Sequence, residues 1–230
     1  TCSWYLCTET QHVTRESLPE LRSNVEFLCT NTNCRSFQVE AVYNQGRADG
    51  ARLAIDDIDS FVDSYMDSFR YASENGRNLH YSSARPHLLT STFCGATTNA
   101  LIVTADGELT ACYEVFDHSH PLADDFIIGK MDPDNGVSLY PGKRSALLSR
   151  IIENRNSCID CFCYYHCAGD CPPKAFLAQM KNDQFRCSVT KAITRELIID
   201  RIAENDGFWK GDIVRKETFK AIDKKCNNTL

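Results

Sequence analysis

Cysteines are concentrated in one short stretch of this chain. Of its thirteen cysteines, five lie between residues 158 and 171, spaced C-x2-C-x-C-x3-C-x3-C: Cys158, Cys161, Cys163, Cys167 and Cys171. A thiolate is a soft ligand that binds zinc, copper(I) or iron–sulfur clusters, and several thiolates close together need such a centre to offset their charge. Cysteines two residues apart can bind one metal centre from a tight turn. The spacing therefore predicts a metal-binding segment, and its five thiols favour two sites that share it.

Length and charge narrow the class of protein. The chain has 230 residues, enough for one large domain or two small ones. Its formal net charge of −6 and its lack of a basic stripe argue against a nucleic acid partner. No run approaches the roughly eighteen apolar residues of a membrane helix, so no span is predicted. The sequence starts at Thr1 without a signal-peptide pattern, which indicates a fragment of a longer cytoplasmic protein.

The cysteine count also bears on redox state. Disulfide frameworks are typical of small secreted domains with thin cores, and this chain is neither small nor poor in apolar residues. An odd count of thirteen and the tight local spacing favour metal binding by reduced thiols over pairing. The cysteines near the two ends are expected to be buried or incidental thiols, although Cys29 and Cys34 could pair in oxidised material: Cys2, Cys7, Cys29, Cys34 and Cys226.

Residues 1–88 alternate between strand and helix patterns. Apolar residues recur at every second position in 36–43 and at helical spacing in 56–75, where Gly76 marks the stop. A capping box at Ser17–Glu20 opens an earlier helix. This alternation predicts about three parallel β/α units, too few to close a barrel, and hence part of one. The expected elements are a strand ending at 11–15, a helix over 17–28, a strand over 36–43, a helix over 56–75 and a strand over 79–82.

After residue 88 the pattern changes to a hairpin, loops and helices. Asp106-Gly107 separates two apolar strands, 100–105 and 108–115, and is a strong hairpin signal. Cys94 lies before the first of these strands and Cys112 on the second. The remaining expected elements are a loop-rich region over 117–144 with a short strand at 126–129, helices over 144–154, 173–182 and 188–205, and a charged tail from 211.

The cysteines after residue 90 form a longer pattern: C94-x12-G107-x4-C112, then C158-x2-C161-x5-C167-x3-C171, then C187. This pattern resembles the seven-cysteine signature of the SPASM domain, the C-terminal extension of radical S-adenosylmethionine (SAM) enzymes that mature ribosomal peptides and sulfatases. The preceding strand–helix units resemble the last half of the six-unit partial barrel of such enzymes. The resemblance implies an α/β partial-barrel fragment at 1–88, an α+β SPASM domain with a β-hairpin and cysteine-rich loops at 89–210, and a tail at 211–230.

The resemblance also implies two auxiliary [4Fe–4S] clusters. Cys94, Cys112 and Cys171 would hold the first cluster. Cys158, Cys161, Cys167 and Cys187 would hold the second, and the neighbouring Phe162, Tyr164 and Tyr165 are expected to shield the clusters from water. Some relatives have a fourth cysteine for the first cluster where this chain has Ala100. The first cluster would therefore have an open iron for a substrate thiolate or amide, or Cys163 would be its fourth ligand.

The motif that generates the radical is missing. Radical SAM chemistry needs C-x3-C-x2-C, which leaves one iron of a cluster free to bind SAM, and the cysteines before residue 40 do not have this spacing. The chain as given is expected to bind auxiliary clusters without making the radical. The full-length parent would be an oxidoreductase that binds SAM and a third [4Fe–4S] cluster. Its partners would be a peptide or protein substrate and the N-terminal part of its own barrel.

Two residues of the first part are candidates for binding cofactor or peptide. Arg47 follows the strand 36–43 in a turn that resembles a feature of radical SAM cores, and ligands bind at the carboxyl ends of parallel strands. A pairing of Arg47 with Asp49 explains this arginine equally well. Glu40 alternates away from the apolar face of its strand and points either into the barrel lumen or into solvent.

A different class of protein explains the same cysteines. Each set of thiolates could hold zinc with tetrahedral geometry. The alternative to the enzyme is therefore a non-catalytic, cysteine-rich zinc or iron–sulfur module that recognises a partner.

Overall fold

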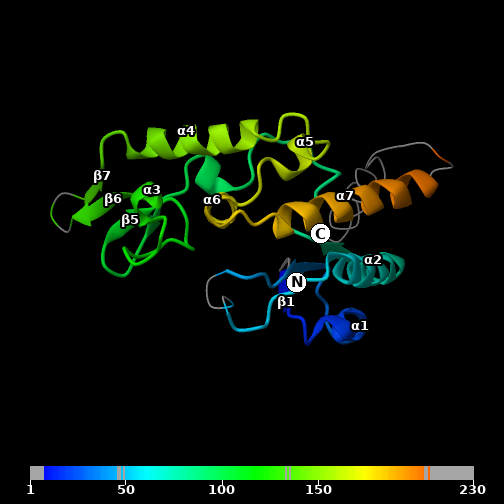
Figure 1. Ribbon diagram of the computed structural model, residues 1–230. Coiled ribbons are helices and arrows are strands. Elements are labelled where there is room, and N and C mark those ends of the chain that lie inside the picture. The colour runs from blue at the N-terminus through cyan, green and yellow to red at the C-terminus, as the bar shows by residue number, and fades with distance from the viewer. Residues whose placement is uncertain are drawn as a thin grey trace, which may run out of the picture.

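The computed structural model describes residues 8–45, 48, 50–132, 134, 136–204 and 207. In these residues the chain is a mixed α/β protein with one parallel and one antiparallel sheet (Figure 1). The parallel sheet is open, with three strands in the order β1-β2-β3. Its elements alternate as the sequence predicts: β1 (Thr8–Val13), α1 (Leu21–Asn31), β2 (Ser36–Ala41), α2 (Ile58–Glu74) and β3 (Asn78–His80).

The ends of the two helices show which local signals were reliable. The expected capping box at Ser17 is wrong, because the Ser17 hydroxyl accepts the Thr14 amide at 2.9 Å and makes no side-chain cap; Leu18–Glu20 is a 3-10 turn and α1 begins at Leu21. Asp57 caps α2 instead, accepting the Ser60 amide at 3.0 Å. The predicted stop at Gly76 is confirmed, since its φ of 67° lies in the left-handed region.

The antiparallel sheet contains the predicted hairpin. Its order is β4 (Ile102–Val103), β5 (Glu108–Thr110), β6 (Ile127–Asp132) and β7 (Gly136–Leu139). Gly107 has a φ of 80°, as the turn between β4 and β5 requires. Cys112 lies beyond β5 and not on it, because the Thr110 hydroxyl bonds the amide and carbonyl of Cys112 and ends the strand. The hairpin β6–β7 and the short α3 (Ala123–Phe126) occupy the region expected to be mostly loop.

Four helices follow the sheet: α4 (Lys143–Asn156), α5 (Tyr164–Cys167), α6 (Pro172–Lys181) and α7 (Phe185–Ala203). Helices α4 and α6 pack on the antiparallel sheet in one core, where the rings of Phe126 and Phe176 lie 6.0 Å apart. Helix α7 returns to the parallel sheet and buries Val189 and Ile193 in the core of the first part, beside α2 (Figure 1). Among the residues described, no helix combines the length and apolar character needed to cross a membrane.

A glycine in β6 offers a test of the antiparallel sheet. A Cβ at Gly129 would overlap the Ser138 carbonyl oxygen and lie 3.0 Å from the Leu139 Cα. We expect Gly129→Ala to lower the free energy of unfolding by about 2 kcal/mol, because backbone of a paired strand cannot move aside without losing its hydrogen bonds. Urea unfolding measures the loss. The control is Lys130→Ala at the exposed neighbouring position, and equal losses in the two variants would contradict the steric account.

Candidate metal centre

A sharp turn directs the cysteine-rich loop. Ala168, Gly169 and Asp170 are three successive residues in the left-handed region, with φ values of 54°, 85° and 69°. Gly169 also passes close to α4, since a Cβ there would lie 3.2 Å from the Arg155 Cβ. Pro172 then starts α6, so the chain reverses between the last two cysteines of the loop.

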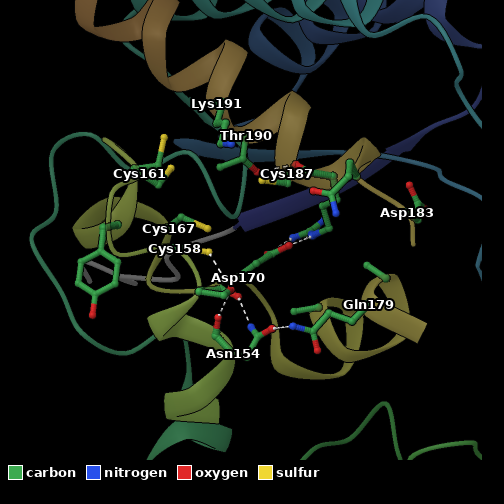
Figure 2. A pocket seen from close by; sticks show the side chains of 18 residues that line it. Asn154, Cys158, Cys161, Cys167, Asp170, Gln179, Asp183, Cys187, Thr190 and Lys191 are labelled. Atoms are coloured by element: carbon green, nitrogen blue, oxygen red, sulfur yellow. Dashed lines mark hydrogen bonds and ion pairs between the residues drawn. The ribbon is translucent and has the colours of Figure 1, made fainter. Parts of the chain in front are cut away.

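Five thiols line one cavity at the junction of this loop with α7. The cavity has a volume of about 150 Å³, and Figure 2 shows the labelled cysteines of the loop facing the first turn of α7. Among these five are all four residues that the resemblance assigns to the second cluster. The five cysteines are Cys158, Cys161, Cys163, Cys167 and Cys187.

Cys163 lies with this second set. Cys163 is 2% exposed, and the thiols of Cys161 and Cys187 lie near it. Burial raises the pKa of the Cys163 thiol to about 12. Of the two possible fourth ligands for the first cluster, a protein thiol from Cys163 is therefore the one that the geometry disfavours.

The first set gathers around Glu114. Burial raises the pKa of the Cys112 thiol, and the nearby Glu114 carboxylate and Cys94 thiol add to this effect. Burial likewise raises the pKa of the Cys171 thiol, and Glu114 is the charge that adds most to this rise. Glu114 itself is ion-paired with Lys174, at 3.2 Å. Cys112 therefore lies near both Cys94 and Glu114, and Glu114 also lies near Cys171.

The five thiols line the cavity, but the described residues form no site for a single metal ion. In the described ranges, no three His, Cys, Asp or Glu side chains are placed so that they could hold a single metal ion. Tetrahedral zinc needs its sulfur ligands about 2.3 Å from the metal. A four-iron cluster binds each thiolate at a different corner, so its ligands lie farther apart. The five thiols that line the second cavity are donors of the type that such a cluster binds.

The aromatic residues of the loop shield the cavity only in part. Tyr164 lines the cavity. Its ring packs edge-to-face against that of Tyr165, with 4.9 Å between the ring centroids, and the Arg155 guanidinium lies over it. Phe162 and Tyr165, expected to exclude water as well, are 55% and 56% exposed. Of the three aromatic residues, Tyr164 alone lines the cavity, and shielding of a cluster by it stays a prediction.

Of the two residues predicted to bind cofactor or peptide, the structure describes Glu40 alone. Arg47 lies outside the described residues. The Glu40 side chain is 7% exposed, so the expectation of a solvated strand face is wrong. Its Oε1 accepts from Gln38 Nε2 at 3.0 Å and from the Ser82 amide at 2.9 Å, and its Oε2 accepts from Arg186 at 3.1 Å. These three bonds satisfy the carboxylate within the protein.

Sequence reasoning missed the centre of this network, Arg186. Its guanidinium is 5% exposed and donates to Asp170 through Nε and Nη2, at 2.6 and 3.0 Å, as well as to Glu40. Burial opposes the charge of Arg186, but the carboxylate of Asp170 outweighs burial and raises the pKa of Arg186 above its usual range. Burial also opposes ionisation of Asp170, and Arg186 nevertheless lowers the Asp170 pKa. The sequence did contain a signal for these two residues, because each lies immediately before a candidate ligand: Arg186 before Cys187, and Asp170 before Cys171.

The N-terminal cysteines behave differently from those of the loop. Cys29 is a buried free thiol, as expected. Cys34 is disulfide-bonded, so the expectation of a free thiol there is wrong, and so is the alternative of a Cys29–Cys34 pair. The Arg77 guanidinium lies between the end of α1 and β2 and bonds the carbonyl oxygens of Cys29, Thr32 and Cys34, which fixes this corner without a Cys29 disulfide. Cys2, Cys7 and Cys226 lie outside the described residues.

The buried network makes a stability prediction. Arg186→Met removes the guanidinium that Asp170 and Glu40 share, and leaves two carboxylates in the interior. We expect a loss of about 3–5 kcal/mol in the free energy of unfolding. The matched control is Arg195→Met on the same helix, whose ion pair with Glu196 is exposed and contributes little. Urea unfolding measures the free energy of unfolding of both variants. If the loss in Arg186→Met exceeded that in Arg195→Met by less than about 1 kcal/mol, Arg186 would be dispensable for stability.

Comparison with known proteins adds no family. No protein-family model matches the chain. No curated protein matches its sequence either.

Proposed function

We propose that the chain is the auxiliary-cluster part of a radical SAM enzyme that modifies a peptide or protein in the cytoplasm. In this proposal the parallel sheet with α1 and α2 is the end of a partial β/α barrel. Residues 89–210 form a SPASM domain that binds two [4Fe–4S] clusters. When bound, the clusters supply one-electron transfer or, at an open iron of the first cluster, ligation of the substrate.

One observation carries the proposal. Cys187 is separated from the cysteine-rich loop by α6, yet its thiol lines the same cavity as Cys158, Cys161 and Cys167. These four residues are the complete set that the resemblance assigns to the second cluster. An unrelated set of cysteines would not be expected to coincide with a four-ligand signature drawn from two segments.

The division of the remaining thiols agrees with two clusters. Cys112 and Cys171 share Glu114 as a neighbour, and Cys94 is a neighbour of Cys112. This chain of neighbours supports a first cluster with three cysteine ligands and an iron that carries no cysteine. Because Cys163 lines the second cavity, this iron is the site where a substrate thiolate or amide would bind.

The open parallel sheet supports the proposed partner within the parent protein. Strand β1 pairs with β2 on one side, and in the part of the chain described here no strand lies on its other side. An unpaired edge exposes backbone donors and acceptors that bind a further strand. The preceding units of the barrel would continue the sheet at this edge.

Metal analysis tests the proposal directly. After anaerobic purification and reconstitution with iron and sulfide, we expect about eight iron and eight sulfide per chain, with the brown absorbance of [4Fe–4S] clusters. Stoichiometric zinc without sulfide, even after reconstitution, would support the zinc module in place of the enzyme part.

Single cysteine variants test the assignment of ligands. Cys187→Ala is expected to lower the iron content to about four per chain, because the second cluster loses a ligand from α7. Cys163→Ala is expected to keep about eight, since neither cluster depends on it. Cys29→Ala, which removes a buried thiol from the core of the first part, is the control for handling and folding. Loss of the first cluster in Cys163→Ala would contradict the open iron.

A further inference from the structure

A larger cavity, the strand-end pocket, lies at the carboxyl ends of β1 and β2. Its volume is about 740 Å³, within the range of roughly 300–1,000 Å³ that is typical of ligand pockets. The two strands end level with each other, and the residues that follow them line the pocket: Arg15 after β1, and Tyr43 and Asn44 after β2. In open α/β sheets ligands bind in this position, outside the carboxyl ends of the strands.

The turn between α6 and α7 forms another wall of the strand-end pocket. Lys181 is the last residue of α6, and Asp183 and Phe185 lead into α7. Lys181 Nζ donates to the Asn44 carbonyl oxygen at 3.3 Å, which ties this turn to the end of β2. Figure 2 labels Asp183 among the residues that line the cavity of the five thiols, and Asp183 lines the strand-end pocket too. A ligand in this pocket therefore lies next to the candidate metal centre.

Cations outnumber carboxylates in the strand-end pocket. Its charged side chains, among the residues described, are those of Arg15, Arg52, Lys181, Asp56 and Asp183. Both carboxylates have partners within the protein: Asp56 accepts from Arg15 at 2.5 Å, and Asp183 accepts the Phe185 amide at 2.8 Å. The surplus of positive charge fits an anionic ligand.

Arg52 is the strongest candidate to bind such a ligand. In the described part of the chain its exposed side chain makes no hydrogen bond or ion pair. Its φ of 56° lies in the left-handed region, a conformation that costs free energy for a residue other than glycine and is concentrated at ligand sites. An unpaired guanidinium can give two parallel hydrogen bonds to one carboxylate.

Apolar side chains line the pocket beside these cations. Ile55 is 4% exposed, and the aromatic residues Tyr43 and Phe185 line the pocket with it. Burial raises the pKa of Tyr43, so its side chain stays a neutral phenol at physiological pH. The pocket therefore offers both a cationic and an apolar surface.

We propose that the strand-end pocket binds an acidic residue of the peptide substrate together with an apolar neighbour of that residue. Arg52 binds the carboxylate through two parallel hydrogen bonds, and Lys181 adds positive charge from the end of α6. The apolar neighbour packs against Tyr43, Ile55 and Phe185. This inference rests on the proposed function for a peptide as the ligand, and it names the class of peptide.

Fluorescence anisotropy of the full chain tests the pocket. The probe is the peptide Gly-Glu-Phe-Gly-amide with a neutral fluorophore on its amino end, and its matched analogue carries glutamine in place of glutamate. We expect the glutamate peptide to bind at least about fivefold more tightly, because only its carboxylate makes charge-assisted hydrogen bonds. Equal affinities for the two peptides, or binding of neither, would overturn the proposal.

Arg52→Asn isolates the arginine. Asparagine removes the charge and tolerates the left-handed conformation, so the backbone is not disturbed. The preference for glutamate over glutamine is expected to fall below about twofold in this variant. Arg195→Asn, at an exposed ion pair on α7, is the matched control and should keep the full preference. An unchanged preference in Arg52→Asn, or an equal loss in both variants, would contradict the role of Arg52.

The amino-acid end of SAM is the other carboxylate that the proposed function brings to this chain. Calorimetric titration with SAM separates the two sources. Binding of SAM that Arg52→Asn abolishes, without binding of the glutamate peptide, would assign the pocket to the cofactor and overturn the peptide proposal. Anisotropy needs neither iron nor sulfide, so failure to assemble clusters, with the glutamate preference intact, would count against the proposed function and not against the peptide pocket.

Discussion

The arrangement of this protein depends on a guanidinium that is removed from water. Arg186 of α7 binds Glu40 of β2, 146 positions away in sequence, and Asp170 of the cysteine-rich loop, 16 positions away. A buried ion pair of this kind adds little net stability over an apolar replacement, but it specifies one arrangement, since any other leaves charges unpaired in the interior. The parallel sheet, the loop and α7 are thereby fixed in relation to one another.

Apolar packing alone would not fix the position of the cysteine-rich loop relative to the two sheets. The structure has one core around the parallel sheet and another around the antiparallel sheet, and α7 contributes Val189 and Ile193 to the former. The same helix places Cys187 beside the cysteine-rich loop. This loop leads into α6, and Phe176 of α6 packs in the core around the antiparallel sheet. The candidate centre therefore lies where the two parts meet, and rigid helices position its ligands on both sides.

Local periodicity predicted the elements that make this possible, including β2, α2 and the turn at Gly107. It was wrong where a polar side chain had a choice of partners. Ser17 bonds back to Thr14 and does not cap α1, and Thr110 ends β5 before Cys112. The cavity and the Arg186 network could not be predicted from spacing, because their members come together only after α7 packs beside α2. Cys163 illustrates the limit: the sequence places it in the window but does not say which set it faces.

Cations near the thiols complete the electrostatic account. Burial raises the pKa of thiols in both sets, which opposes the thiolate form that binds metal. Lysine counters burial on each side, because Lys191 hydrogen-bonds Cys187 in the second set and Lys174 lies near Cys171 in the first. Arg85 bonds the Cys167 carbonyl oxygen at 3.2 Å, and burial lowers the Arg85 pKa although Cys167 and Cys94 act in the opposite direction. Fixed positive charges therefore favour thiolates in an interior that otherwise disfavours them, and a bound metal centre would supply the remaining compensation.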